Sequence, residues 1–335
     1  MILGLWLAFV VSTSFSAEPV TKELHLVQGC RIFSDRGELI EVFPGGMCIF
    51  FADGSFVSAT ESSLRMFDKN NEVKWELPGV YHHQLNLSED GTSLLAIRSE
   101  DYKKNGRLVR MDTFSVIDLS GKVLKQTTSR KVLNERHKDL LHQTKVPTFS
   151  SASREISHFN SFYEIPENTR GKTNEIYKRG NYVLNSANQG VFILDSELRA
   201  IDSMLFNFSL GHNVHDVQVN KKGNLVFFNN RAMPFKEDRA FSALQELDPE
   251  TFNIVFEFTA SPKEMFYSQF CGAYQELGDD VVLFSDQLVG TYFYSKSRKE
   301  ILQSFRNLHR ADGLAFPIQQ VKGVYGIADF FKNRN

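Results

Sequence analysis

Strand-like alternation of apolar and polar residues runs along almost the whole chain. Apolar segments of about five to eight residues are separated by polar turns that contain glycine. A period of two places successive side chains on opposite faces of a strand, and the turn signals join such strands into hairpins. The clearest turns are ADGS at 52–55, SEDG at 88–91, KKGN at 221–224 and LGDD at 277–280. The pattern predicts an all-β fold.

The hairpins belong to a larger unit that repeats. Each unit has a first strand, a polar turn, a second apolar strand and a more exposed outer pair, which is the content of one four-stranded propeller blade. The first strands are predicted at GMCIFF from Gly46, HHQLNL from His82, HFNSFYEI from His158, HDVQV from His215, FCGAYQEL from Phe270 and FPIQQV from Phe316. We therefore predict a six-bladed β-propeller that occupies residues 22–335 as a single domain.

The two ends of the chain complement each other in this scheme. The sixth unit lacks outer strands, while the segment from Leu24 to Phe43 is a strand pair without inner partners of its own. The N-terminal strands should complete the last blade, because closing the ring removes exposed sheet edges.

Two segments interrupt the repeat. Residues 132–144 place apolar side chains near helical spacing and are followed by Pro147, so we predict a short helical insertion near 132–145. Residues 167–180 are charged and show no apolar face, which predicts an exposed loop.

The N-terminus resembles an export signal. Ile2 to Val11 is an apolar run of ten residues followed by small residues up to Ala17. This run is too short to span a bilayer, so no transmembrane span is predicted. We interpret residues 1–17 as a signal peptide and expect a periplasmic or secreted protein. A structural strand or a retained anchor is the alternative.

Charge and cysteine content narrow the classes further. Lys and Arg total 38 against 40 Asp and Glu, with no long run of one sign, which argues against a nucleic-acid partner. Three cysteines, Cys30, Cys48 and Cys271, allow at most one disulfide, whose pairing stays open. The oligomeric state is open as well.

Histidines recur at one phase of the repeat. A propeller's first strands line its channel, and His82 or His83, His158 and His215 stand at the starts of such strands. The ends of the second strands should return to the same rim. These ends carry Arg98, Ser99, Ser186, Asn188, Asn230 and Arg231.

Such a set would suit an anionic ligand. Imidazoles with Asn160 and one or two arginines offer hydrogen bonds and positive charge to a sulfate or phosphate group. A neutral imidazole could also act as nucleophile or general base. Histidines that only bond neighbouring backbone are the structural alternative. Three histidines could instead hold zinc, but a nearby arginine would repel a cation, so no metal site is predicted.

The ordered units HHQLNLSEDGTSLLAI, HFNSFYEIPEN, YVLNSANQG and HDVQVNKKGNLVFFNNR resemble the bacterial arylsulfate sulfotransferase family, from about residue 45 to 310. The resemblance implies an exported six-bladed propeller that moves a sulfuryl group from a phenyl sulfate ester to a phenol. It implies neither a nucleotide donor nor any cofactor. A histidine would be transiently sulfated.

The resemblance also implies roles for individual residues. His215 would be the nucleophile, a neighbouring histidine would handle the phenolic proton, and His83, His158 and Asn160 would surround the sulfate. The sequence departs from the family pattern at Asn188, where an arginine is usual; Arg231 or Arg98 could replace it. We predict as catalytic His215, His158 and His83, and as substrate-binding His82, Asn160, Asn188, Arg231 and Arg98.

Two other functions are alternatives. A non-catalytic exported propeller could bind an anionic ligand or an envelope protein, since this fold hosts many functions. A quinoprotein dehydrogenase would share the architecture, but Trp75 in NNEVKWELP is not part of a repeated tryptophan unit.

Overall fold

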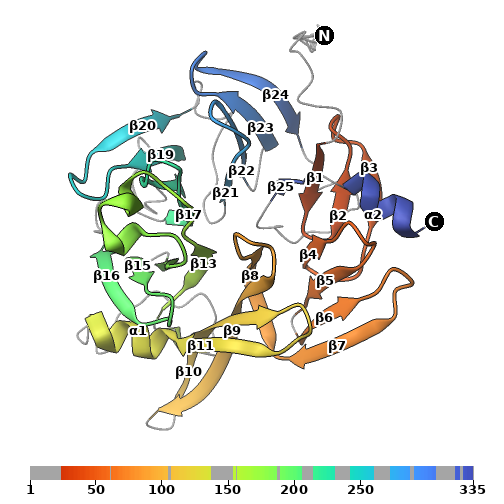
Figure 1. The fold of residues 1–335 in the computed structure, drawn as a ribbon, viewed down its shortest axis with the longest axis horizontal. Helices are drawn as coiled ribbons and strands as arrows, with labels where there is room; N and C mark the ends of the chain where they lie inside the picture. The colour runs from red at the N-terminus through yellow and green to blue at the C-terminus, as the bar shows by residue number, and fades with distance from the viewer. Residues whose placement is uncertain are drawn as a thin grey trace, which may run out of the picture.

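The protein is a β-propeller of six blades arranged around a central axis (Figure 1). The structure, a computed structural model, describes residues 24–60, 62–104, 107–136, 154–155, 157–186, 189–205, 214–230, 242–259, 272–286, 290–306, 321–324 and 327–334. Each blade is an antiparallel sheet that runs outward from an inner strand at the axis. The predicted fold class is confirmed.

The blades are numbered from the one that closes the ring. Blade 1 contains β25 (Val321–Val324), β1 (His25–Gln28), β2 (Arg31–Phe33) and β3 (Leu39–Val42). Blade 2 contains β4 (Met47–Phe50), β5 (Phe56–Ala59), β6 (Ser63–Phe67) and β7 (Val73–Pro78). Blade 3 contains β8 (Val80–Leu87), β9 (Ser93–Lys104), β10 (Arg107–Asp118) and β11 (Val123–Thr128), and β12 (Arg154–Glu155) pairs with β10.

The other three blades follow the same order from axis to periphery. Blade 4 contains β13 (Phe159–Glu164), β14 (Tyr182–Ser186), β15 (Gly190–Leu194) and β16 (Ala200–Leu205). Blade 5 contains β17 (Val214–Val219), β18 (Leu225–Asn229), β19 (Ala243–Leu247) and β20 (Ile254–Phe258). Blade 6 contains β21 (Gly272–Glu276), β22 (Val281–Asp286), β23 (Gly290–Ser295) and β24 (Glu300–Arg306).

The four predicted turns join inner and second strands. They connect β4 to β5, β8 to β9, β17 to β18 and β21 to β22. Gly223 illustrates why glycine is needed: its φ of 91° lies in the left-handed region, which a side chain disfavours. Asn220 completes this turn because its side-chain oxygen accepts the Lys222 and Asn224 amide protons, both at 3.0 Å.

The hydrophobic core lies between successive blades. Blades 3 and 4 share a cluster in which Phe114, Phe159, Phe162 and Phe192 are fully buried. The clusters at the other junctions are built in the same way. Apolar side chains from the inner, second and third strands therefore hold each blade against the next, and the inner strands of blades 3, 4 and 5 also carry buried polar groups.

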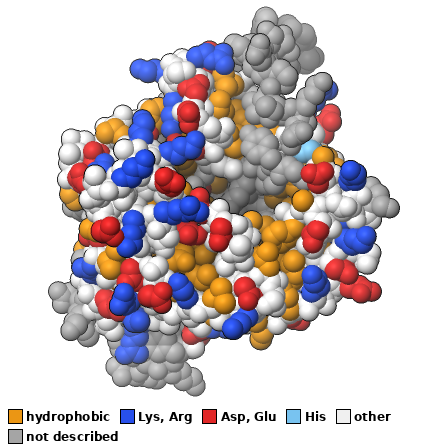
Figure 2. Space-filling model, viewed as in Figure 1, with side chains coloured by type: hydrophobic (Ala, Val, Ile, Leu, Met, Phe, Trp, Pro, Cys, Tyr) orange, Lys and Arg blue, Asp and Glu red, His pale blue; other side chains and the backbone are white. Residues whose placement is uncertain are grey.

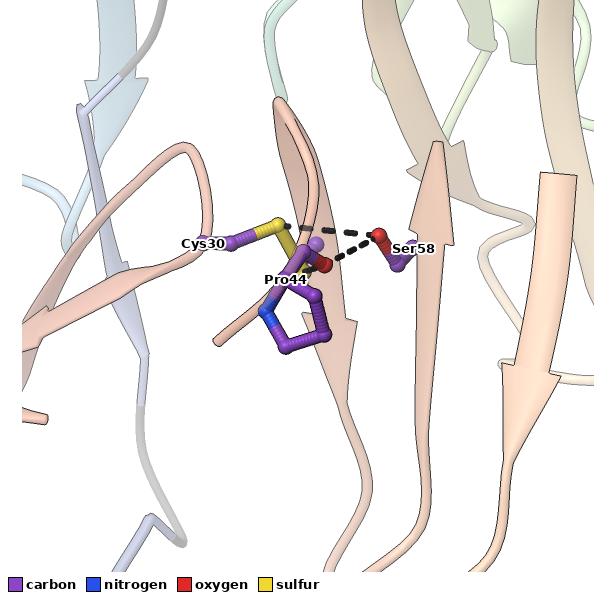
Figure 3. The surroundings of a disulfide bond; sticks show 4 residues. Cys30, Pro44 and Ser58 are labelled. Atoms are coloured by element: carbon purple, nitrogen blue, oxygen red, sulfur yellow. Dashed lines mark hydrogen bonds between the residues drawn. A yellow bond between two sulfur atoms is a disulfide. The ribbon is translucent and has the colours of Figure 1, made fainter. Parts of the chain in front are cut away.

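The ring closes as the sequence predicts, through the pairing of both chain ends. The C-terminal strand β25 pairs antiparallel with β1, with Leu26 opposite Gly323. A disulfide joins Cys30 to Cys48 and so links blade 1 to blade 2 (Figure 3). Beside it, the Ser58 hydroxyl donates to the Pro44 carbonyl at 2.6 Å.

A C-terminal helix adds a further link between blades 1 and 2. Helix α2 (Ile327–Arg334) lies beside these blades in Figure 1 and buries Phe330. The Arg334 guanidinium donates to the Gly54 carbonyl at 2.9 Å and lies 5.1 Å from the Phe43 ring centroid.

The two interruptions of the repeat differ from their predictions in detail. The helix expected near 132–145 is α1 (Ser129–Arg136); it begins before the predicted segment and buries Val132 and Leu133, while residues 137–150 lie outside the described ranges. The prediction of an exposed loop at 167–180 is right only in part, because Asn168 and Tyr177 are buried. This segment forms the short 3-10 helices η2 (Arg170–Lys172) and η3 (Glu175–Tyr177).

Tertiary contacts explain the order of this segment. The Tyr177 side chain is buried between blades 4 and 5. Arg170 reaches blade 5, where its guanidinium lies 3.1 Å from Asp248 and 2.7 Å from Glu250. Arg170 is therefore paired across a blade junction, whereas Lys178 pairs with Glu175 of the same segment and both side chains are exposed.

Candidate active site

The inner strands of blades 3, 4 and 5 are bulged near their starts. In β8, residues 82–84 stand opposite the single residue Ile97. In β13 the extra residue is Asn160, and in β17 Asp216 and Val217 stand opposite Phe227. A bulge bends its strand and turns side chains away from the regular alternation, which is why bulges are frequent next to active sites. The candidate residues lie at or beside these bulges.

The structure brings the predicted histidines together. The ring centroids of His82 and His83 are 4.8 Å apart, and those of His83 and His158 are 4.5 Å apart, in both cases edge to face. His158 in turn lies close enough to His215 to affect its pKa. Blades 3, 4 and 5 thus contribute four imidazoles to one continuous group.

His215 is buried and neutral. The pKa of His215 is lowered from 6.5 to about 3, chiefly by burial and in part by the nearby His158, while the hydrogen bond to Asn230 opposes the shift. The His215 Nδ1 lies 2.6 Å from the Asn230 Oδ1. A carboxamide oxygen only accepts, so Nδ1 carries the proton and Nε2 keeps its lone pair. A neutral ring with a lone pair on Nε2 has the form that nucleophilic attack requires.

Asn160 hydrogen-bonds to Val214, the residue before His215. Its side-chain amide donates to the Val214 carbonyl at 3.0 Å, and its oxygen accepts from Asn185 Nδ2 at 2.6 Å. Asn185 donates to the same Val214 carbonyl at 2.6 Å. Two carboxamides of blade 4 therefore fix the start of β17, and with it the position of the His215 backbone.

Asp216 ties four blades together directly behind His215. Its side chain is 2 % exposed, and its φ of 57° places it in the left-handed region. Oδ1 accepts from the Tyr163 hydroxyl at 2.6 Å and from the Gln84 amide, while Oδ2 accepts from the Tyr274 backbone N–H at 2.6 Å. These donors come from blades 4, 3 and 6. Hydrogen bonds of this kind satisfy a buried carboxylate.

Asp112 approaches the histidines from β10, the third strand of blade 3. Its carboxylate is fully buried, with Oδ1 at 3.1 Å from the His82 Nε2. Oδ2 accepts from the Phe159 N–H at 3.2 Å, at the start of β13. The backbone N–H of Asp112 donates to the Ser129 hydroxyl of α1 at 3.0 Å. One side chain therefore holds His82 and the strand that follows His158.

The other predicted residues have different positions. Arg98 stands opposite Tyr81 in the β8–β9 pair, and its guanidinium forms an ion pair with Glu100. Asn188 and Arg231 lie outside the described residues, so their predicted roles stay predictions. In the ranges that the structure describes, no group of three or more His, Cys, Asp or Glu side chains could hold a metal ion.

Sequence reasoning missed Asp112, Asp216 and Asn185 as parts of the site. Asp112 lies in RLVRMDTFSVID, where a carboxylate within an apolar strand contradicts the usual burial preference. That conflict is a detectable signal, but it does not name the partner. Asp216 lies in the HDVQV motif, in which only His215 was predicted to belong to the site.

The predicted resemblance is confirmed over part of the chain. The family model of arylsulfotransferase (ASST) matches residues 46–170. The matched segment begins in blade 2 and extends through blade 3 and the inner strand of blade 4, so it includes His82, His83, His158 and Asn160 but ends before His215. The match supports an arylsulfotransferase-like function with small aromatic substrates.

Comparison with solved structures supports the fold alone. A Bacteroides caccae protein of unknown function aligns with a TM-score of 0.56 at 12% identity, over 90% of this chain and 99% of that chain. The β-propeller domain of Cps50 (Swd1) from Myceliophteria thermophila aligns with a TM-score of 0.46 at 12% identity, over 84% of this chain and 72% of that chain. No curated protein sequence matches the chain.

The surface carries charged side chains of both signs. Figure 2 shows Lys and Arg side chains interspersed with Asp and Glu over the face viewed. No helix among the described residues has the length and apolar character needed to cross a membrane.

Proposed function

We propose that the protein transfers a sulfuryl group from a phenolic sulfate ester to a phenol through a sulfated His215. The observation that carries the proposal is the His215 imidazole, which is kept neutral by burial and has Nδ1 bonded to Asn230. The family match over residues 46–170 supports the substrate class.

The first half-reaction forms an N–S bond. His215 Nε2 attacks the sulfur atom, the sulfur–oxygen bond to the phenyl ring breaks, and the phenolate leaves with a proton. The imidazole gains positive charge as its lone pair enters the new bond. Asn230 stabilises that charge because the Nδ1–H bond to its oxygen strengthens as the ring becomes cationic. In the second half-reaction the acceptor phenol attacks sulfur and restores neutral His215.

Positioning accounts for most of the catalysis in such a transfer, because charge on the three sulfuryl oxygens changes little. His158 lies near His215 and His83 adjoins His158, so both imidazoles can donate hydrogen bonds to these oxygens. Asn160 contributes by fixing Val214. Arg231, Asn188 and Arg98 remain proposed contributors to anion binding.

The adduct on His215 tests the proposal. The protein is mixed with 4-nitrophenyl sulfate without an acceptor, and nitrophenol release and the mass of the His215 peptide are measured. We expect one equivalent of nitrophenol and one added sulfuryl group on that peptide. His215→Asn should give neither, while His25→Gln in blade 1 should behave as the parent. A parent protein that releases no nitrophenol and carries no adduct contradicts the proposal.

We also propose export, with residues 1–17 as a cleaved signal. The Cys30–Cys48 pairing supports this, because structural disulfides persist in oxidising compartments. Expression in a bacterium, cell fractionation and N-terminal sequencing of the mature chain test it. An uncleaved chain found only in the cytoplasmic fraction would exclude export.

A further inference from the structure

The proton that the departing phenolate needs has a candidate source in the structure. His82 adjoins the histidine group, with its ring 4.8 Å from that of His83, and its side chain is 19 % exposed. It can therefore meet a ligand at one edge while its other edge faces Asp112. The contact between His82 Nε2 and Asp112 Oδ1 is 3.1 Å.

The Asp112 carboxylate is built to hold that ring in one orientation. Its side chain is fully buried, and the two oxygens have separate partners, His82 and the Phe159 N–H. Rotating the carboxylate would break both contacts. A carboxylate only accepts, so neutral His82 carries its proton on Nε2 and presents the lone pair of Nδ1.

We propose that His82 is the acid and base of the sulfuryl transfer and that Asp112 is its positioning residue; this inference rests on the proposed function. When the sulfur–oxygen bond breaks, protonated His82 gives its Nδ1 proton to the leaving phenolate oxygen. When the acceptor phenol attacks sulfur and the bond to His215 breaks, the phenol proton passes to His82 Nδ1. Each cycle returns His82 to its starting form.

The dependence on the leaving group tests this assignment. Phenyl sulfate releases a basic phenolate that needs a proton, whereas dinitrophenyl sulfate releases one that leaves unprotonated. General acid catalysis contributes about 10²–10⁴-fold where it is needed. Asp112→Asn should therefore lower the rate of His215 sulfation about 10²-fold or more with phenyl sulfate, and less than about 10-fold with dinitrophenyl sulfate. His82→Gln should show the same pattern, and the double variant should be no slower than the slower single variant.

Asp101→Asn is the matched control, because Asp101 belongs to the same sheet and pairs on the surface with Arg110, 3.0 Å away. It should not change either rate. If Asp112→Asn fails to fold, His82→Gln still tests the assignment, because it leaves the Asp112 bond to Phe159 intact. Nitrogen NMR of His82 provides a readout without turnover: at a pH where the ring is neutral, the parent should show its proton on Nε2.

The outcomes separate the two proposals. Equal rate losses with both esters, or a neutral His82 ring in the parent whose proton is on Nδ1, overturn the His82–Asp112 assignment and leave the sulfated His215 standing. Absence of phenol release and of adduct in the parent overturns the proposed function and the assignment with it.

Discussion

Blades 3, 4 and 5 differ from blades 1, 2 and 6 in one feature of the backbone. In all six blades the register shifts between the third and the outer strand. Between the inner and second strands it shifts only in blades 3, 4 and 5; in the described parts of β25, β4 and β21 this pairing is regular. The outer shift therefore belongs to the repeat, and the inner shift is a departure from it.

The inner-strand register shifts occur in the same blades as the candidate site residues. The clustered histidines belong to the three blades with inner bulges, and the closing disulfide belongs to two blades without them. A repeat that each blade follows gives a stable ring, and extra residues in three inner strands redirect polar side chains toward one another. Stability and the candidate site are thus placed in different parts of the ring, which the following variants test.

The largest loss of stability is expected for Asp216→Ala. It leaves donors from blades 3, 4 and 6 without their acceptor, at about 1–3 kcal/mol for each buried group, so we expect the unfolding free energy to fall by about 4 kcal/mol. Glu276→Ala is the comparison in regular blade 6, where the carboxylate bonds Tyr274 and Lys296 of its own blade. That variant should cost about 1 kcal/mol. Urea unfolding measures both, and equal losses would contradict the special position of Asp216.

The next largest loss of stability is expected on removal of the disulfide that joins blades 1 and 2. The Cys30–Cys48 bond spans 18 residues, for which the chain-entropy relation gives about 3 kcal/mol. We expect Cys30→Ser with Cys48→Ser to lower the unfolding free energy by that amount. Sulfuryl transfer should keep its parental rate at a temperature where both proteins are folded. A rate loss above about tenfold in the folded variant would show that closure and site are coupled.

We expect acid to lower the unfolding free energy through the protonation of His215. Its pKa is about 3 when folded and 6.5 as the reference, so below pH 6.5 the unfolded chain binds a proton that the folded chain does not. Stability is therefore present above that pH and is lost as the pH falls toward 3, by about 2 kcal/mol between pH 7 and 5. His215→Gln should lack this contribution. Unfolding in urea at both pH values measures it, and an identical pH dependence in parent and variant would refute it.

The smallest effect is expected for Arg170→Met at the junction of blades 4 and 5. Asp248 and Glu250 are partly exposed, so solvent screens their pairing with Arg170 and we expect a loss of about 1 kcal/mol. Transfer should be unchanged, because this contact lies outside the histidine group. A thermal melt with a turnover assay checks both statements; a slower transfer would extend the site to this junction.

Local patterns predicted most of the fold. Alternation and glycine turns identified the hairpins, since both depend on neighbouring residues. Local patterns predicted the segment at 167–180 less well. One of its charges, Arg170, finds a partner more than 50 positions away at Gly223, which composition does not reveal.

The sequence by itself determined the blades, the phase at which His82, His158 and His215 recur, and the closure of the ring by both ends. Only the tertiary structure decided that Asp112 bonds His82, that Asp216 joins four blades and that Cys30 pairs with Cys48. The physical reason is distance along the chain: Gln84 and Asp216 are 132 residues apart. A strand's periodicity reports which face a side chain occupies, whereas its partner depends on how the blades pack.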